Sequence, residues 1–150
     1  MKPALKSWLL AAGLAAAVTG CGPTDAGEQP ALPRIEACFV SADNNHAVVL
    51  EVASEGRERQ RGLMGRTALE DEAGMLFTYR SERPASHGFW MFQTLIPLDI
   101  AYLDDNGVIV SIQTMTPCPS SRGRDCPSYP SGQPFWNAVE MNAGYFEAQG

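Results

Sequence analysis

The segment DDNG at 104–107 constrains the fold more than any other part of this sequence. Asn-Gly and Asp-Gly pairs favour the tight turns that connect neighbouring antiparallel strands. The segments on either side, 99–103 and 108–112, are rich in apolar and β-branched residues, which are typical of strands. We therefore predict a β-hairpin near the middle of the chain.

Short strands separated by strong turn signals are also expected elsewhere. Four further segments predict strands: 35–40, 47–52, 75–79 and 135–141. Pro97 separates 89–96 from 98–103, because proline cannot donate a hydrogen bond within a sheet. Polar or proline-rich loops are expected at 80–86 and 116–134.

Helix is predicted only in short pieces. These are 55–62, capped by Ser54 and ended by Gly62, then 69–73, closed by Gly74, and 143–149. Together the elements predict a mainly β fold with two or three short helices. The chain would form either a compact jelly-roll-like sandwich or a partly closed barrel.

The N-terminus has the features of a bacterial lipoprotein leader. Lys2 and Lys6 precede an apolar run at 8–18 that is too short to span a bilayer, and the segment VTGC follows. We expect residues 1–20 to be a signal peptide and Cys21 to be the lipidated first residue of the mature chain. Residues 21–34 would then be a flexible tether, and residues 35–150 a single β domain.

Such a chain would lie on the periplasmic side of the cell envelope, held to the membrane by the acyl chains on Cys21. Gly22 rather than aspartate follows, which favours the outer membrane where a cell has one. Cleavage removes both lysines and leaves nine arginines against seventeen acidic residues, a net charge of −8. This acidity argues against nucleic acid as a partner and against docking on anionic lipid headgroups.

The segment FWMFQTLIPLDI at 89–100 is almost entirely apolar, yet it contains Asp99. A buried carboxylate is costly unless it is paired or hydrogen-bonded. The structural interpretation is an ion pair with Arg59, Arg61 or Arg66, or hydrogen bonds from backbone amides near Pro97. The functional interpretation is a general base or a ligand contact. In the same segment, Trp90 and Met91 fit either the core or the lining of a pocket.

Three cysteines remain after lipidation. Cys118 and Cys126 flank a polar loop and are predicted to form a disulfide, since the periplasm is oxidising, whereas Cys38 is left unpaired. The chain contains no CxxC or HxxxH spacing, so no metal and no cofactor is predicted. It also lacks the nucleophile-elbow, zinc-protease and phosphate-loop motifs of common enzymes.

Five sequence blocks within residues 36–150 carry a family resemblance. In order they are ERQRGLMGR, EAGMLF, FWMFQTLIPLDIAYLDDNG, PCPSSRGRDCPSYPSG and VEMNAG. They resemble the family called domain of unknown function 192 (DUF192). The resemblance implies a compact, mostly β fold like a jelly roll with short helices, and it implies no established activity. The motif positions carried over include Arg59, Gly62, Arg66, Gly74, Trp90, Met91, Thr94, Asp99, Glu140 and Gly144.

The chain departs from the family pattern in two places. Members commonly have a basic residue and then asparagine after the FWM triplet, where Phe92 and Gln93 stand here. The family domain also usually continues beyond the position of Gly150 with a last strand. Either the last strand of the family is dispensable in this domain, or the sequence is that of a shortened gene product with an exposed sheet edge.

We expect a membrane-anchored periplasmic lipoprotein whose β domain binds a small ligand or an envelope protein without catalysis. The candidate binding residues are Arg59, Arg66, Trp90, Met91, Thr94 and Asp99. One alternative is a hydrolytic enzyme that uses Asp99 with Arg66 or Thr94. Another is a structural or accessory module of the envelope.

Overall fold

The structure is a computed structural model that describes residues 31–42 and 44–149. The predicted signal peptide, Cys21 and most of the tether lie outside these residues. The described part is mainly β, as predicted, with two short α-helices and one 3-10 turn. The strands are β1 Arg34–Val40, β2 Asn45–Ala53, β3 Ala73–Arg83, β4 Gly88–Trp90, β5 Leu98–Leu103, β6 Ile109–Met115, β7 Ser128–Pro130 and β8 Phe135–Asn142. The helices are α1 Gly56–Arg61, η1 Gly123–Asp125 and α2 Tyr145–Gln149.

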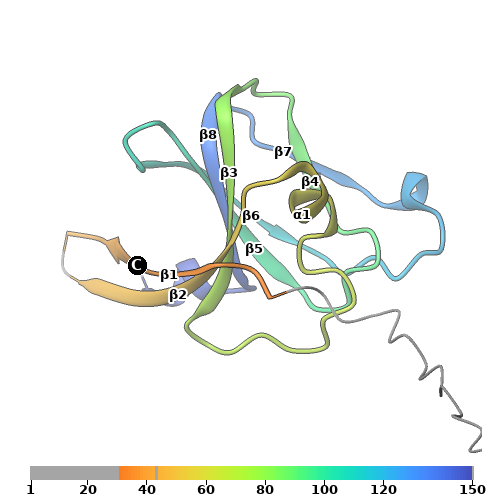
Figure 1. The fold of residues 1–150 in the computed structure, drawn as a ribbon, viewed down its shortest axis with the longest axis horizontal. Coiled ribbons are helices and arrows are strands. Elements are labelled where there is room, and N and C mark those ends of the chain that lie inside the picture. The colour runs from red at the N-terminus through yellow and green to blue at the C-terminus, as the bar shows by residue number, and fades with distance from the viewer. Residues whose placement is uncertain (1–30, 43, 150) are drawn as a thin grey trace, which may run out of the picture. The chain divides into compact units, whose positions relative to one another are not determined.

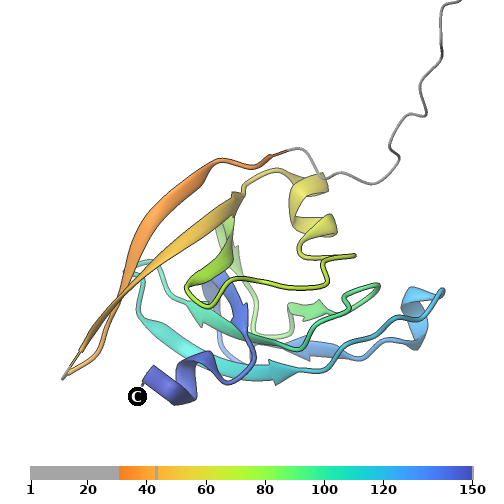
Figure 2. The same cartoon turned by 90° about the horizontal axis from the view of Figure 1, so that it is seen from below.

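Six strands form one curved sheet in the order β1-β2-β3-β8-β5-β6 (Figure 1). The first and last strands in this order do not pair with each other, so the sheet is not a closed barrel. All neighbours are antiparallel except β2 and β3, which run parallel and are connected through α1. The two remaining strands, β4 and β7, pair as a small second sheet. Figure 2 shows α1 and β4 on the same side of the curved main sheet.

The predicted hairpin at the centre of the chain is confirmed. Strands β5 and β6 pair antiparallel around the turn at 104–107. The Asp104 carboxylate accepts hydrogen bonds from the backbone amides of Asn106 and Val108, at 2.9 and 2.8 Å. The aspartate side chain thus stabilises the turn by bonding to its own backbone. The predicted strands at 35–40 and 47–52 are also confirmed as the hairpin β1–β2.

Several element predictions were wrong. Residues 69–73 are not helical, and Gly74 lies inside β3 rather than after a helix. That strand runs on to Arg83, through half of the predicted 80–86 loop, because it pairs again with β8 beyond an irregularity. The 116–134 loop contains η1 and β7, whereas only the start of 89–96 is a strand.

The cap of α1 also differs from the prediction. The N-cap residue is Glu55 rather than Ser54, and the Glu58 carboxylate accepts the backbone amides of both, at 2.8 Å each. Glu58 is the third residue of the helix, and a carboxylate there accepts hydrogen bonds from backbone amides that have no partner within the helix. The helix ends at Gly62, as predicted.

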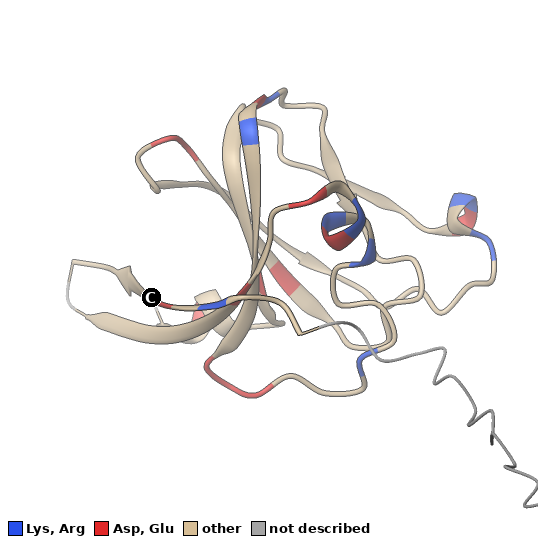
Figure 3. Cartoon of the chain, in the orientation of Figure 1, with Lys and Arg blue, Asp and Glu red and all other residues tan. Residues whose placement is uncertain are grey.

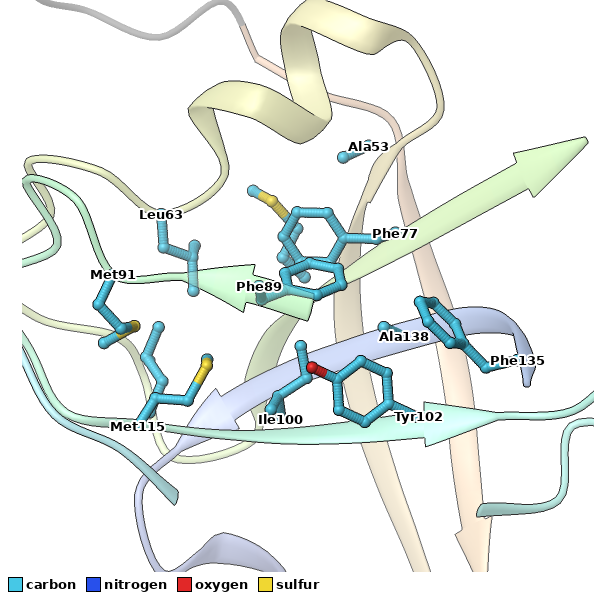
Figure 4. Packing of buried hydrophobic residues seen from close by; sticks show 12 residues of the cluster. Ala53, Leu63, Phe77, Phe89, Met91, Ile100, Tyr102, Met115, Phe135 and Ala138 are labelled. Atoms are coloured by element: carbon cyan, nitrogen blue, oxygen red, sulfur yellow. The ribbon is translucent and has the colours of Figure 1, made fainter. Parts of the chain in front are cut away.

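Two apolar clusters lie on the two faces of the main sheet. The larger one fills the space beneath α1 and β4, and Figure 4 shows its side chains converging from both sheets. Its fully buried members include Leu63, Phe77, Met91, Ile100, Tyr102, Met115 and Phe135. The smaller cluster packs β2 and β8 against α2. The larger cluster fixes α1 and β4 over the sheet, and these are the elements that border the cleft described below.

Gly74 allows the central strands to approach closely. A Cβ atom at this position would lie 2.4 Å from Sδ of Met141 and 2.5 Å from the backbone oxygen of Glu140. No side chain fits there unless β3 and β8 move apart. The sequence predicted that Gly74 ends a helix. In the structure, glycine is required there because the neighbouring strands pack so closely.

We predict that Gly74→Ala destabilises the domain by about 1–3 kcal/mol, the usual cost of overpacking a core. Denaturant unfolding followed by circular dichroism measures this difference. Gly56→Ala is the matched control, because no atom lies within 4 Å of a Cβ there and its helical backbone suits alanine. Equal stability of both variants would contradict the packing argument.

Candidate ligand-binding cleft

A cleft of about 350 Å³ lies between α1, the C-terminal end of β3, and β4. Figure 3 marks basic positions along α1 and near the end of β3, on an otherwise acidic chain. The cleft combines two arginines, a histidine, an amide and aromatic rings. The residues that matter for its chemistry are Arg59, Gln60, Tyr79, Arg83, His87 and Trp90.

Two guanidinium groups lie against one aromatic ring in this cleft. The Cζ atoms of Arg59 and Arg83 are 4.8 and 5.2 Å from the centroid of the Tyr79 ring. Arg59 also donates from Nη1 to the backbone oxygens of Ser54 and Thr78, which fixes it between α1 and β3. Among the described residues, neither arginine forms an ion pair with a carboxylate. Both positive charges are thus held in place without a neutralising partner.

Arg83 has an additional unused donor. Its Nε atom is buried and has no hydrogen-bond partner in the described part of the chain. A buried donor without a partner costs about 1–3 kcal/mol, and more when the group is charged. Such a donor is stabilised when an acceptor, a water molecule or a ligand atom, reaches it.

The histidine of the cleft is neutral and held in one tautomer. Burial, followed by the charges of Arg83 and Arg59, lowers the pKa of His87. Its Nδ1 lies 3.3 Å from Nη2 of Arg83, which can only donate, so Nδ1 accepts and the proton is on Nε2. Nε2 then donates to the Tyr79 hydroxyl, 3.5 Å away. The Tyr79 hydroxyl proton is left free to donate into the cleft, and burial raises its pKa so that it stays bound.

Trp90 forms an aromatic wall of the cleft and remains 41% exposed. Its indole packs directly on η1, since a Cβ at Gly123 would lie only 2.5 Å from the ring. The η1 turn belongs to the loop closed by a disulfide between Cys118 and Cys126. The predicted disulfide is thus present, and its loop supports the tryptophan. Cys38 is unpaired, as predicted, and it is exposed.

A small recess adjoins the cleft and shares Arg59, Gln60, Phe89 and Trp90 with it. It has room for about 20 Å³ and is also lined by Thr94 and Glu140. Glu140 is 5% exposed, and burial raises its pKa to about 8. No hydrogen bond to its carboxyl group is found among the described residues. The register of the sheet places it opposite Met75 and Ile100, facing the larger core.

The other predicted site residues are spread over the domain. Arg66 forms a bidentate ion pair with Glu51, with N–O distances of 2.9 and 2.6 Å, in a separate hollow beside β2. Met91 is fully buried in the larger cluster and lines neither the cleft nor the recess. The structure therefore brings together Arg59, Trp90 and Thr94 but separates them from Arg66 and Met91.

The surroundings of Asp99 indicate a structural role. It is 3% exposed, and its two oxygens accept hydrogen bonds from the Thr114 hydroxyl at 2.7 Å and the Gly144 backbone amide at 2.9 Å. The first of the two structural interpretations was an ion pair with an arginine, and no ion pair of Asp99 with Arg59 or Arg66 is found among the described residues. The alternative interpretation, a bond from a backbone amide, is what the structure shows. Asp99 connects β5 to β6 and to the start of α2.

Sequence reasoning did not single out Tyr79, Arg83 and His87. Tyr79 ends a predicted strand, Arg83 lies in the predicted loop 80–86 and His87 follows that loop, and no spacing motif relates them. Glu140 had a detectable signal, because a carboxylate stands in the otherwise apolar segment AVEM. Among the described residues, no group of His, Cys, Asp and Glu side chains is placed to hold a metal ion. No helix of the described part is long and apolar enough to cross a membrane.

The family model of DUF192 (Uncharacterized ACR) matches residues 38–150, so the chain belongs to this family. It is also similar to a crystal structure from Sinorhizobium meliloti 1021 named as a candidate transcription regulator. That match has 27% identity and a TM-score of 0.70, and it covers 82% of this chain and 90% of the other. A protein of unknown function from Novosphingobium aromaticivorans DSM 12444 matches with 28% identity and a TM-score of 0.65, covering 89% and 86%. No curated protein matches the chain.

We predict that Asp99→Ala destabilises the domain by about 2–4 kcal/mol, because it leaves the Gly144 amide and the Thr114 hydroxyl without their acceptor. Asp99→Asn should stay within about 1 kcal/mol of wild type, since its amide oxygen still accepts and its nitrogen can donate to the hydroxyl. Thermal and denaturant melts measure both. Asp105→Ala, in the exposed turn, is the control. Two unchanged Asp99 variants would rule out the structural role.

Glu140 predicts a pH-dependent stability. Its pKa in the folded chain is about 8, above its ordinary value of 4.5, so the folded state holds a proton that the unfolded state has lost. The stabilisation is fully present below pH 4.5 and is lost as the pH rises to about 8, by at most about 1.4 kcal/mol per pH unit. Glu140→Gln should remove this dependence. Unfolding of both proteins at pH 5, 6, 7 and 8 measures it, and a difference that is constant with pH would contradict it.

Proposed function

We propose that this DUF192 domain is the ligand-binding part of a lipid-anchored periplasmic protein, and that its cleft binds a small organic anion with a planar or apolar body. The observation that carries this proposal is the pair of guanidinium groups of Arg59 and Arg83, held on Tyr79 without a carboxylate partner. Guanidinium groups match carboxylates in charge and geometry. The ligand would supply the missing negative charge.

The other polar groups of the cleft support the same ligand. Arg83 Nε and the Tyr79 hydroxyl are both donors, and the neutral His87 already uses both of its nitrogens within the cleft. A cleft rich in free donors favours an acceptor, and a charged acceptor gains the most from it. The exposed ring of Trp90 offers a flat surface for the body of the ligand.

The geometry gives no support to hydrolysis. Asp99 bonds to Thr114 and Gly144, Arg66 is paired with Glu51, and Thr94 lines the recess. None of these residues activates another. DNA is a poor candidate for a partner, because a net charge of −6 disfavours contact with its phosphates.

Binding can be tested with benzoate and its uncharged isostere benzamide on the mature chain, kept soluble by Cys21→Ser. Calorimetry should detect benzoate and not benzamide. Arg83→Gln should weaken benzoate binding by about tenfold or more, the usual value of one charge-assisted hydrogen bond. Arg57→Gln is the matched control, because this α1 arginine is exposed and does not line the cleft. Equal binding of the two probes, or equal loss in both variants, would contradict the proposal.

The anchor is tested separately. Its support is the leader pattern that ends in VTGC, whose residues lie outside the described part of the structure. Mass spectrometry of the protein purified from membranes should give an N-terminal Cys21 that carries acyl chains. Cys21→Ser should move the protein from the membrane to the soluble fraction. A mature N-terminus at another residue would refute the anchor and leave the ligand-binding proposal standing.

A further inference from the structure

Two nearly buried polar side chains line the recess beside the cleft. Thr94 is 4% exposed and Glu140 is 5% exposed, and both line the same hollow. No side-chain hydrogen bond of either residue is found within the described residues. Polar side chains in such a position are normally hydrogen-bonded, so both are open to a partner that enters the recess.

The size of the recess limits what can enter it. Its volume of about 20 Å³ admits one group of the size of a water molecule. The recess is next to the cleft, since Arg59, Gln60, Phe89 and Trp90 line both hollows. A ligand held at the two arginines and against Trp90 can therefore direct a small substituent toward Glu140.

We infer that the recess is a hydroxyl-binding subsite, and that the ligand is a hydroxylated organic anion whose hydroxyl group bonds to Glu140 and Thr94. This inference rests on the proposed function of the cleft. A hydroxyl group fits because it both donates and accepts, as do a protonated carboxyl group and a threonine hydroxyl. Burial raises the pKa of the Glu140 carboxyl group to about 8, so at neutral pH this group is protonated and can donate as well as accept.

The test compares benzoate with its 2-, 3- and 4-hydroxy derivatives by calorimetry on the mature Cys21→Ser chain. At least one hydroxybenzoate should bind about tenfold more tightly than benzoate, the gain expected from one or two neutral hydrogen bonds. Glu140→Gln, whose amide also donates and accepts, should keep most of this gain. Thr94→Val should lose part of it, and Glu140→Ala should lose it entirely, where the gain is the ratio of hydroxybenzoate to benzoate affinity measured within each variant.

The outcomes separate the two proposals. If benzoate binds but no hydroxybenzoate binds more tightly, the recess holds only a trapped water, and the hydroxyl subsite is refuted while the anion cleft stands. If a hydroxybenzoate gains affinity equally in wild type, Glu140→Ala and Thr94→Val, the gain arises elsewhere and the subsite is again refuted. If no benzoate binds, the cleft proposal itself fails. Should Glu140→Ala not fold, Thr94→Val and Glu140→Gln still decide the question.

Discussion

The pairing of β3 with β8 is the contact on which the rest of the structure depends. It joins the first half of the sheet, β1-β2-β3, to the second half, β8-β5-β6, across about sixty residues of sequence. Gly74 allows this approach, since any side chain there would collide with β8. The same two strands carry Tyr79, Arg83 and Glu140, so the pairing that holds the two halves together also assembles the cleft and its recess.

The cleft differs chemically from the protein around it. The chain is acidic overall, yet two arginines meet here without an ion-pair partner among the described residues, and Arg83 Nε is a further donor. Two buried acidic residues, Asp99 and Glu140, differ in what surrounds them. Asp99 satisfies a backbone amide and a hydroxyl, whereas Glu140 is nearly buried and lines the recess. Of the two, the glutamate is the one in a position to meet a ligand.

The sequence predicted the elements that depend on local signals. The DDNG turn, the first hairpin, the end of α1 at Gly62 and the short disulfide loop all follow from neighbouring residues. It did not predict features that depend on pairing between distant strands. Gly74 was read as a helix end, and β3 was ended too early, because only β8 shows why the strand continues. Arg59, Trp90 and Thr94 were predicted as candidates because they lie in the sequence motifs. Tyr79, Arg83 and His87 were not predicted, because only the folded chain brings them to the cleft.

The central claim is that Arg59 and Arg83 together hold the negative charge of a ligand. Nitrogen-15 NMR of the arginine Nε–H groups tests it most directly, because it observes the proposed contacts one by one. On addition of benzoate, the signals of Arg59 and Arg83 should shift and saturate together, with the hydrogen-bonded proton of Arg83 moving downfield. Signals of Arg57 and Arg122, which lie outside the cleft, should stay unchanged. Arginine signals that do not move, or that all move alike without saturation, would contradict the account.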